Sequence, residues 1–215
     1  MTPVQISRDR FSEVFWNIVD EKVDEVPWDK LEEMIKSRQR YRLTADYNTG
    51  SVSIGDAAEL YRLVKFFKPE VIAEVGTFIG VSTMSMYMAD EFFRIYTCDM
   101  SNDLISLFED ADEVIKYFPK TTSTQMFKQM AETNLGIDLM YLDGRLQRED
   151  LELFHKIIHD QTIFVFDDFV GIEKGVVNAM MVESPGRVLI YPREGKRTAV
   201  SLPFTMLQFV PQEAT

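Results

Sequence analysis

From Val71 onward, short apolar runs alternate with segments of helical periodicity, and this alternation restricts the fold more than any other feature of the chain. The apolar runs cover residues 71–75, 95–99, 114–118, 138–143 and 162–167. Strands that alternate with helices form βαβ units, which cross over in a right-handed sense and build a parallel sheet. We therefore predict an α/β protein with a Rossmann-like, doubly wound, mostly parallel sheet. Its ligands should bind beyond the carboxyl ends of the strands.

The two ends of the chain differ from this pattern. In RVLIYPREGKRTAVSLP (187–203), two β-rich runs flank Glu194 and Gly195, which predicts an antiparallel C-terminal hairpin at one edge of the sheet. Residues 1–50 show two helical stripes, one starting near Phe11 and one after Pro27, and no strand. We expect them to form an N-terminal helical lid or appendage on a domain of residues 51–215, the whole being one structural unit.

The composition limits what the chain can bind. Its 215 residues, 46% of them hydrophobic, can bury the core of one α/β domain. The net charge of −12 opposes general affinity for nucleic acid or anionic lipid, so we expect a small-molecule substrate and neither nucleic-acid nor membrane binding. The sequence has one cysteine, Cys98, and no long apolar run or apolar N-terminal leader. These features favour a cytoplasmic protein without disulfides.

The stretch AEVGTFIGVS (73–82) joins an apolar strand to a helical segment through glycines. Dinucleotide enzymes use GxGxxG at this place, but here Phe78 stands where the middle glycine should be. The acidic Glu74 beside the turn would repel a pyrophosphate and attract an ammonium or sulfonium group. We therefore expect a positively charged ligand. The glycines could also serve only to permit a tight turn, and Ser82 could cap the helix, bind the ligand or do both.

The motif Glu-x-Gly-x-aromatic-x-Gly-x-Ser resembles the first motif of class I S-adenosylmethionine-dependent methyltransferases, in the variant of the metal-dependent catechol and caffeoyl-coenzyme A O-methyltransferases. Over about residues 50–170, the segments TGSVSIGDAAEL, YTCDM, IDLMYLDG and IFVFDDF are similar to further parts of that family, in the same order. The resemblance implies S-adenosylmethionine as cofactor. The cofactor-binding residues that we expect are Glu74, Gly76, Thr77, Phe78, Gly80, Ser82, Asp99, Met100, Ser123 and Asp143.

Two of these expectations also follow from chemistry. Asp99 ends an apolar strand 25 residues after Glu74, where a carboxylate can accept both ribose hydroxyls, although a helix cap or turn would also explain it. Met100 would lie against the adenine, or else in the core. The family's third motif corresponds to TTSTQMF, which lacks its acidic residue, so only hydroxyl and amide groups such as Ser123 remain for the adenine.

Three carboxylates should converge where the methyl group is transferred. Asp143 ends the fourth predicted strand, and Asp167 and Asp168 end the fifth. Three oxygen donors suit a hard cation such as Mg²⁺, which could lower the pKa of a substrate hydroxyl. In the resembled enzymes the corresponding positions hold the metal. The alternative is that these aspartates cap helices or bind loop amides.

The sequence departs from the resembled group at the general base. The family's lysine, three residues after the strand-four aspartate, is Leu146 here. Arg145 is a poor base but could hold an anionic substrate, so we name Asp143 and Arg145 as catalytic candidates.

Three further residues are candidates for a lid over the substrate: Tyr41, Tyr47 and Asn48. Gly50 or Ser51 would lie near the cofactor. His155 and His159 lie four residues apart on a predicted helix but lack an HExxH signature, so we expect surface residues rather than a zinc site.

We therefore predict a methyltransferase that methylates an oxygen of a hydroxylated small molecule with the help of a divalent metal. A homodimer would fit the resembled group. Two alternatives remain: a catalytically silent protein that binds the cofactor, and an NAD(P)-dependent oxidoreductase with a similar sheet.

Overall fold

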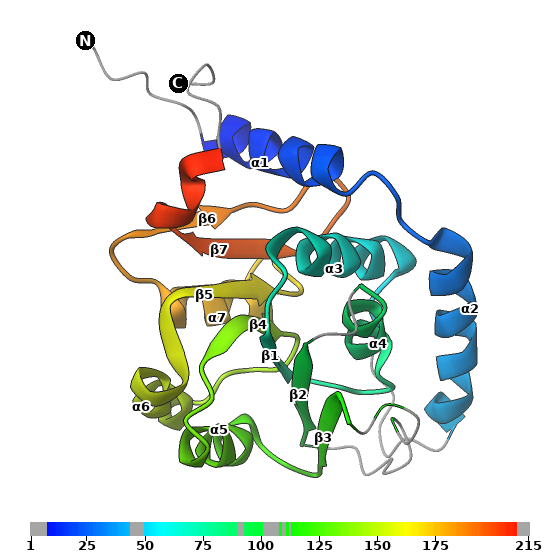
Figure 1. The fold of residues 1–215 in the computed structure, drawn as a ribbon, viewed down its shortest axis with the longest axis vertical. Helices are drawn as coiled ribbons and strands as arrows, with labels where there is room; N and C mark the ends of the chain where they lie inside the picture. Colours follow the sequence, from blue (N-terminus) through cyan, green and yellow to red (C-terminus); the bar gives the residue numbers. More distant parts are fainter. Residues whose placement is uncertain are drawn as a thin grey trace.

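The computed structural model describes residues 8–43, 50–89, 93–100, 108, 111 and 113–209, which include one seven-stranded sheet with helices on both faces (Figure 1). The strands are β1 (Val71–Val75), β2 (Arg94–Asp99), β3 (Ile115–Pro119), β4 (Ile137–Leu142), β5 (Ile158–Phe166), β6 (Arg187–Ile190) and β7 (Ala199–Pro203). Their order in the sheet is β3-β2-β1-β4-β5-β7-β6. The first five strands pair in parallel, and β7 is antiparallel to both β5 and β6. The predicted doubly wound sheet and its antiparallel hairpin are confirmed.

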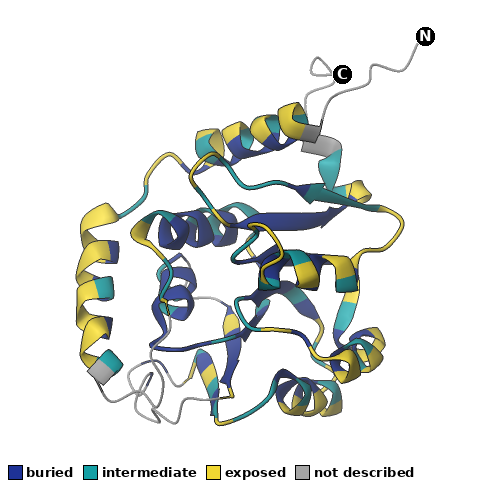
Figure 2. Ribbon diagram, turned by 180° about the vertical axis from the view of Figure 1, so that it is seen from behind, coloured by how far each residue is buried: buried dark blue, intermediate teal, exposed yellow. Residues whose placement is uncertain are grey.

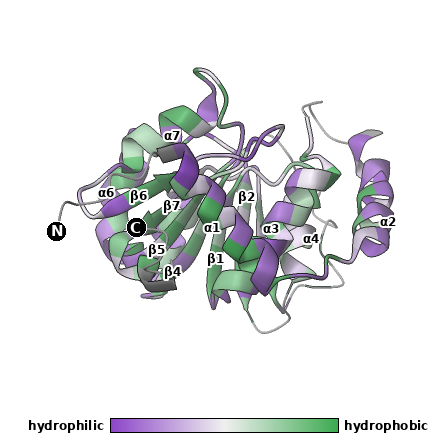
Figure 3. Cartoon of the chain, turned by 90° about the horizontal axis from the view of Figure 1, so that it is seen from above, coloured by the Kyte–Doolittle hydropathy of each residue, from purple (hydrophilic) through white to green (hydrophobic). Residues whose placement is uncertain are grey.

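The helices form two layers around this sheet. They are α1 (Arg8–Lys22), α2 (Trp28–Arg38), η1 (Gln39–Leu43), α3 (Ile54–Phe67), α4 (Val81–Tyr87), α5 (Ser123–Glu132), α6 (Arg148–Ile157), α7 (Lys174–Val182) and η3 (Phe204–Phe209). Buried side chains of α1, α3 and α4 share one apolar cluster with one face of the sheet, and those of α5, α6 and α7 share a second cluster with the other face. Figure 3 shows the strands as mainly hydrophobic ribbons between these layers.

Local sequence signals explain where several helices begin and end. The Ser53 hydroxyl accepts a hydrogen bond from the Asp56 amide at 3.2 Å and caps α3. Helix α3 ends at Phe67, and its C-cap residue, Lys68, adopts a left-handed backbone with φ 50°. Thr122 and Gln125 form a reciprocal capping box at the start of α5, which fixes the loop that follows β3.

The N-terminal helices are held to the rest of the chain by buried contacts. Helix α1 docks on the segment that follows β6: the Trp16 indole N–H donates to the Tyr191 carbonyl at 2.9 Å, and the Ser12 hydroxyl accepts from the Tyr191 amide at 2.9 Å. Helix α2 lies outside α3 and α4, with Leu31 and Met34 buried and its outer side exposed (Figure 2). The division of the chain near residue 50 stays a prediction. None of the described helices is long and apolar enough to cross a membrane.

The segment around the two histidines differs from the prediction. Helix α6 ends at Ile157, and His159 belongs to β5 rather than to the helix of His155. The reason lies in long-range pairing, because Ile158 is registered with Ile137 of β4 and the His159 amide donates to the Thr162 hydroxyl at 2.9 Å. The i, i+4 spacing therefore does not bring the two imidazoles to one helical face.

Candidate active site

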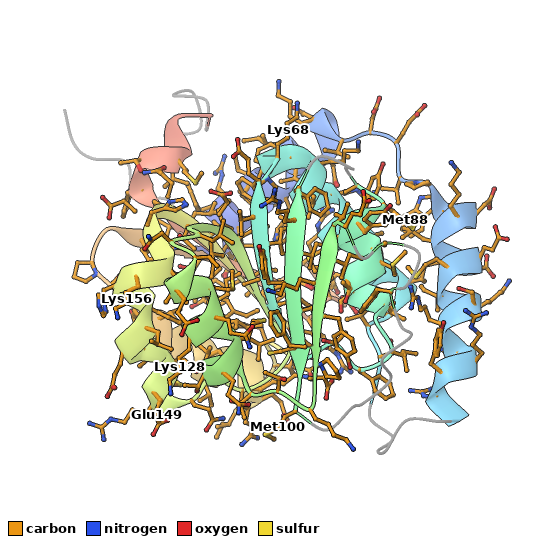
Figure 4. All side chains as sticks on the ribbon, turned by 60° about the horizontal axis from the view of Figure 1, so that its bottom comes forward. Lys68, Met88, Met100, Lys128, Glu149 and Lys156 are labelled. Carbon is orange, nitrogen blue, oxygen red and sulfur yellow. The ribbon has the colours of Figure 1, made fainter. Side chains whose placement is uncertain are left out.

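The candidate site lies at the carboxyl ends of β1 and β4, where the strand order of the sheet reverses. A cavity of about 360 Å³ opens there, which is of the size that small-molecule sites occupy. Figure 4 labels Met100 at this end of the sheet and Lys68, which precedes β1, at the opposite end. The residues that line the cavity are Gly50, Val75, Gly76, Phe78, Cys98, Asp99, Met100, Thr121, Thr122, Ser123, Asp143, Gly144, Arg145, Gln147 and Lys174.

The cavity brings together six of the ten residues predicted for the cofactor. These are Gly76, Phe78, Asp99, Met100, Ser123 and Asp143. The other four, Glu74, Thr77, Gly80 and Ser82, are buried behind it and do not line it.

The glycine turn between β1 and α4 places main chain against the cavity. Gly76 has φ 98°, and a Cβ there would lie 2.8 Å from the Gly144 nitrogen. Phe78 has a left-handed backbone with φ 46°, and its amide donates to the Asp99 carboxylate at 2.7 Å. Only a residue without a side chain therefore fits at position 76, where the ends of β1 and β4 meet.

Glu74 does not face the ligand space, contrary to the expectation that its charge would attract the ligand directly. Its carboxylate is fully buried and accepts hydrogen bonds at 2.5 Å from the hydroxyls of Ser82, Thr83 and Thr97. Burial raises the pKa of Glu74 to about 7, although these hydroxyls oppose the shift. Glu74 therefore ties β1 to α4 and β2.

Of the two roles left open for Ser82, the structure excludes that of helix cap. The N-cap of α4 is Gly80, whose left-handed backbone, φ 76°, makes no side-chain cap. Ser82 lies within the first turn, and its hydroxyl is directed to Glu74 instead.

Asp99 ends β2 with its side chain at the cavity. The residue is 3% exposed, and the Phe78 amide fixes one of its carboxylate oxygens. Met100, directly after it, is 67% exposed and lines the same cavity. Cys98 is buried beside them, and burial raises the pKa of its thiol well above the ordinary value. The carboxylate of Asp99 thus lies at the end of β2, where a group that binds a ribose was expected.

The loop between β3 and α5 forms the neighbouring wall through Thr121, Thr122 and Ser123. The Ser123 hydroxyl donates to the carboxylate of Asp150 at 2.6 Å, and this carboxylate also accepts from the Gln147 amide at 2.7 Å. Asp150 is fully buried and joins the β3–α5 loop to the β4–α6 loop. The sequence analysis missed Asp150, whose only local signal is its place three residues after Gln147, at the start of a helix.

Asp143, Asp167 and Asp168 converge, as predicted from the neighbouring strands β4 and β5. Each offers a carboxylate oxygen, and the three oxygens lie within 4.8 Å of one another. Burial raises the pKa of Asp167 to about 8, and its hydrogen bond with Asp143 adds to the shift. Burial also raises the pKa of Asp143, while the ammonium of Lys174 opposes this shift. The two carboxyls are close enough to influence each other, so their titrations belong to the pair.

Lys174, at the start of α7, stands among these acids, and nothing in the sequence analysis singled it out. Its ammonium contacts the Asp143 carboxylate directly and lies 3.2 Å from the Asp168 carboxylate. Burial lowers the pKa of Lys174, but Asp143 and Asp168 outweigh this and raise it overall. Lys174 therefore carries a positive charge in the cavity, where the sequence had offered no candidate for a general base.

The neighbouring candidates divide between the cavity and the core. Arg145 is exposed at the rim of the cavity. Leu146 is buried, and its amide donates to the Asn178 side chain at 3.0 Å. Gly50 lines the cavity and Tyr41 is half-buried, whereas Tyr47 and Asn48 lie outside the described residues.

The acidic cluster suits a divalent cation by donor type but not by arrangement. Carboxylate oxygens are the donors that Mg²⁺ prefers. Here, however, the Lys174 ammonium already bridges Asp143 and Asp168. A metal ion bound by all three carboxylates would have to displace this ammonium. The cluster as built does not fit the predicted ion.

A larger cavity, of about 630 Å³, lies between α7, β6 and α1. Its lining is mainly apolar, with Phe169, Met180 and Val188 among its residues, and it includes none of the residues predicted from the sequence. Because ionisable groups and the strand ends gather at the smaller cavity, we place the site there.

No protein-family model matches the sequence, and no curated protein matches it. Solved structures do. An O-methyltransferase from Bacillus cereus in complex with S-adenosylhomocysteine is 15% identical with a TM-score of 0.60, over 86% of this chain and 94% of that one. TomG from Streptomyces achromogenes, involved in tomaymycin synthesis and in complex with S-adenosylmethionine, is 17% identical with a TM-score of 0.55, over 93% and 99%.

A third solved structure is the S-adenosylhomocysteine-bound methyltransferase PaMTH1 from Podospora anserina. It is 12% identical with a TM-score of 0.60, over 94% of this chain and 99% of that one. At such identities the likeness concerns the fold. The chain shares the Rossmann-like fold of these three methyltransferases over 86–94% of its length.

Proposed function

We propose that this chain is an S-adenosylmethionine-dependent methyltransferase that methylates an oxygen of a hydroxylated small molecule. The observation that carries the proposal is the placement of Asp99, a carboxylate at the end of β2 that lines the cavity beside a glycine turn. Solved proteins of the same fold bind S-adenosylmethionine or S-adenosylhomocysteine, which supports this choice of cofactor.

The cavity residues fit the parts of this cofactor. Asp99 would accept the ribose hydroxyls, while Gly76 lets the cofactor approach the main chain. Met100 and Ser123 would border the adenine, and Asp143 would face the methionine end. When bound, the cofactor supplies a methyl group on a positively charged sulfur. Glu74, Thr77, Gly80 and Ser82 support the turn from behind rather than touching the cofactor.

The acceptor side is assigned to Asp143, Arg145 and Lys174, which line the same cavity. The Asp143 carboxylate would accept the hydrogen bond of the acceptor hydroxyl, and Arg145 at the rim would hold an anionic part of the substrate. The contribution of the protein is chiefly to place the oxygen in line with the methyl group. No step is assigned to a metal ion, because the cluster does not fit one.

The alternatives are less well supported. An NAD(P)-dependent oxidoreductase would need a GxGxxG turn, and Phe78 takes the place of its middle glycine. A catalytically silent protein would bind the cofactor without turnover of any acceptor in a broad panel. The net charge of −12 supports a small-molecule acceptor over nucleic acid. A homodimer and a cytoplasmic location stay predictions.

Calorimetric titration tests the proposal. S-adenosylmethionine should bind and NAD should not. Asp99→Asn keeps an acceptor for the Phe78 amide but loses the charge, so its affinity for S-adenosylmethionine should fall about tenfold or more. Asp160→Asn, at an exposed position at the start of β5, is the matched control and should bind normally. Binding of NAD in place of S-adenosylmethionine, or an Asp99→Asn variant with undiminished affinity, would contradict the assignment.

A further inference from the structure

Lys174 occupies the central position in the acidic cluster. Its ammonium contacts Asp143 of the β4 end and lies 3.2 Å from Asp168 of the β5 end, so one positive charge bridges two strands. An ammonium offers three N–H donors, of which one hydrogen-bonds to Asp143, while Asp168 forms an ion pair with the same group. Lys174 also lines the cavity.

The protein holds Lys174 in this place through its neighbours on α7. A Cβ on Gly175 would lie 2.1 Å from the Asp167 carbonyl oxygen, so the first turn of α7 packs directly on the main chain of the two aspartates. Four residues after Lys174, the buried Asn178 donates to the Gly144 carbonyl at 2.8 Å and accepts from the Leu146 amide at 3.0 Å. Helix α7 is thus joined to the main chain of Asp167 and Asp168 through Gly175, and to the loop that follows Asp143 through Asn178.

Two carboxylates of the cluster already have cationic partners within the chain. The Lys174 ammonium contacts Asp143 and lies 3.2 Å from Asp168, and the Arg197 guanidinium lies 3.3 Å from Asp168. Three carboxylates without such partners would demand a bound cation, whereas Asp143 and Asp168 obtain their positive charge from the chain itself.

We propose that the ammonium of Lys174 takes the place of a divalent metal ion in this cluster, so that the chain works without one. The inference rests on the proposed methyltransferase function, but the question that the experiment decides is which cation the three aspartates bind. A flexible lysine can serve here because it is a compact point charge with several donors. Its effect is to hold Asp143 and Asp168 in fixed positions at the acceptor end of the cavity.

Binding of Mn²⁺, followed by electron paramagnetic resonance with S-adenosylhomocysteine present, tests the proposal. Mn²⁺ takes the same oxygen ligands as Mg²⁺ and reports on binding without any turnover. The wild-type chain should show no saturable binding at micromolar Mn²⁺. Lys174→Ala frees the three aspartates and should bind Mn²⁺ at least about tenfold more tightly than wild type. Lys156→Ala, which removes an exposed lysine of α6 (Figure 4), should behave as wild type.

Saturable Mn²⁺ binding by the wild-type chain that is lost in Asp143→Asn would overturn the proposal, and so would a folded Lys174→Ala variant that gains no affinity. If Lys174→Ala proves unfolded in thermal denaturation, the wild-type measurement with its Asp143→Asn comparison still decides. Calorimetry with S-adenosylhomocysteine on the same wild-type sample separates the two claims, since absence of binding there refutes the methyltransferase function and not the role of Lys174.

Discussion

Replacing Glu74 by glutamine should make the folded chain less sensitive to alkaline pH. The folded state raises the pKa of this carboxyl from 4.5 to about 7, chiefly through burial, so it holds the proton more tightly than the unfolded state does. The resulting stabilisation is fully present below pH 4.5 and is lost as the pH rises through 7. A shift of this size corresponds to about 3 kcal/mol in total, of which about 2 kcal/mol is lost between pH 5.5 and 8.5.

Glu74→Gln is uncharged at every pH and can keep hydrogen bonds with Ser82, Thr83 and Thr97. Between pH 5.5 and 8.5 its free energy of unfolding should therefore fall by about 2 kcal/mol less than that of the wild-type chain. For a chain of this size the difference corresponds to about 4–8 °C in Tm.

Urea denaturation at the two pH values measures this difference. Other buried acids contribute to the pH dependence of both proteins, so only the difference between them isolates Glu74. Glu70→Gln, at an exposed position just before β1, serves as the control and should follow the wild-type curve. If Glu74→Gln and wild type lose equal stability between pH 5.5 and 8.5, the reasoning from burial is refuted, whatever constant offset separates the two curves.

Three further substitutions or reactions test the packing of the site. Gly76→Ala should lower the free energy of unfolding in urea by at least about 2 kcal/mol, because its Cβ would overlap the main chain after β4 and its φ is positive. Gly50→Ala is the control and should be neutral, since its Cβ meets nothing within 4 Å. Equal effects of the two substitutions would contradict this reasoning. Asp150→Ala leaves the buried Ser123 hydroxyl and the Gln147 amide unpaired and should cost about 3 kcal/mol by the same assay, so a neutral result would show that the two loops do not depend on it. Cys98 should react with a thiol reagent at least about a hundredfold more slowly in the native chain than in urea, and comparable rates would mean that β2 opens readily.

The sheet and the meeting of the aspartates could be predicted because they depend on local patterns. Apolar runs of strand length, separated by helical periodicity, imply a parallel sheet, and residues that directly follow neighbouring strands must meet at one edge of it. The convergence of Asp143 and Asp167 could be predicted from this rule alone. The hairpin likewise followed from two β-rich runs around a glycine.

The direction of Glu74 and the place of Lys174 could not be predicted in this way. Glu74 is turned to the interior by hydroxyls, and one of these, on Thr97, reaches it only when β1 and β2 pair. Lys174 lies on a helix after the last aspartate, and no sequence spacing indicates that Gly175 lets this helix approach the main chain so closely. The positions of such side chains depend on contacts between helices and strands, and the periodicity of the sequence does not predict these contacts.

The docking of α1 against the segment after β6 has a consequence for how the chain comes together. The partners Ser12 and Tyr191 are 179 residues apart in sequence, and the ion pair between Asp20 and Arg193 spans 173. The apolar side of α1 can be covered earlier by α3, because Phe15 packs against Phe66 and Phe67. The polar contacts with Tyr191 and Arg193 cannot form until the segment after β6 has been synthesised. Because contacts of long sequence separation slow folding, we expect the orientation of α1 to be fixed later than its apolar packing.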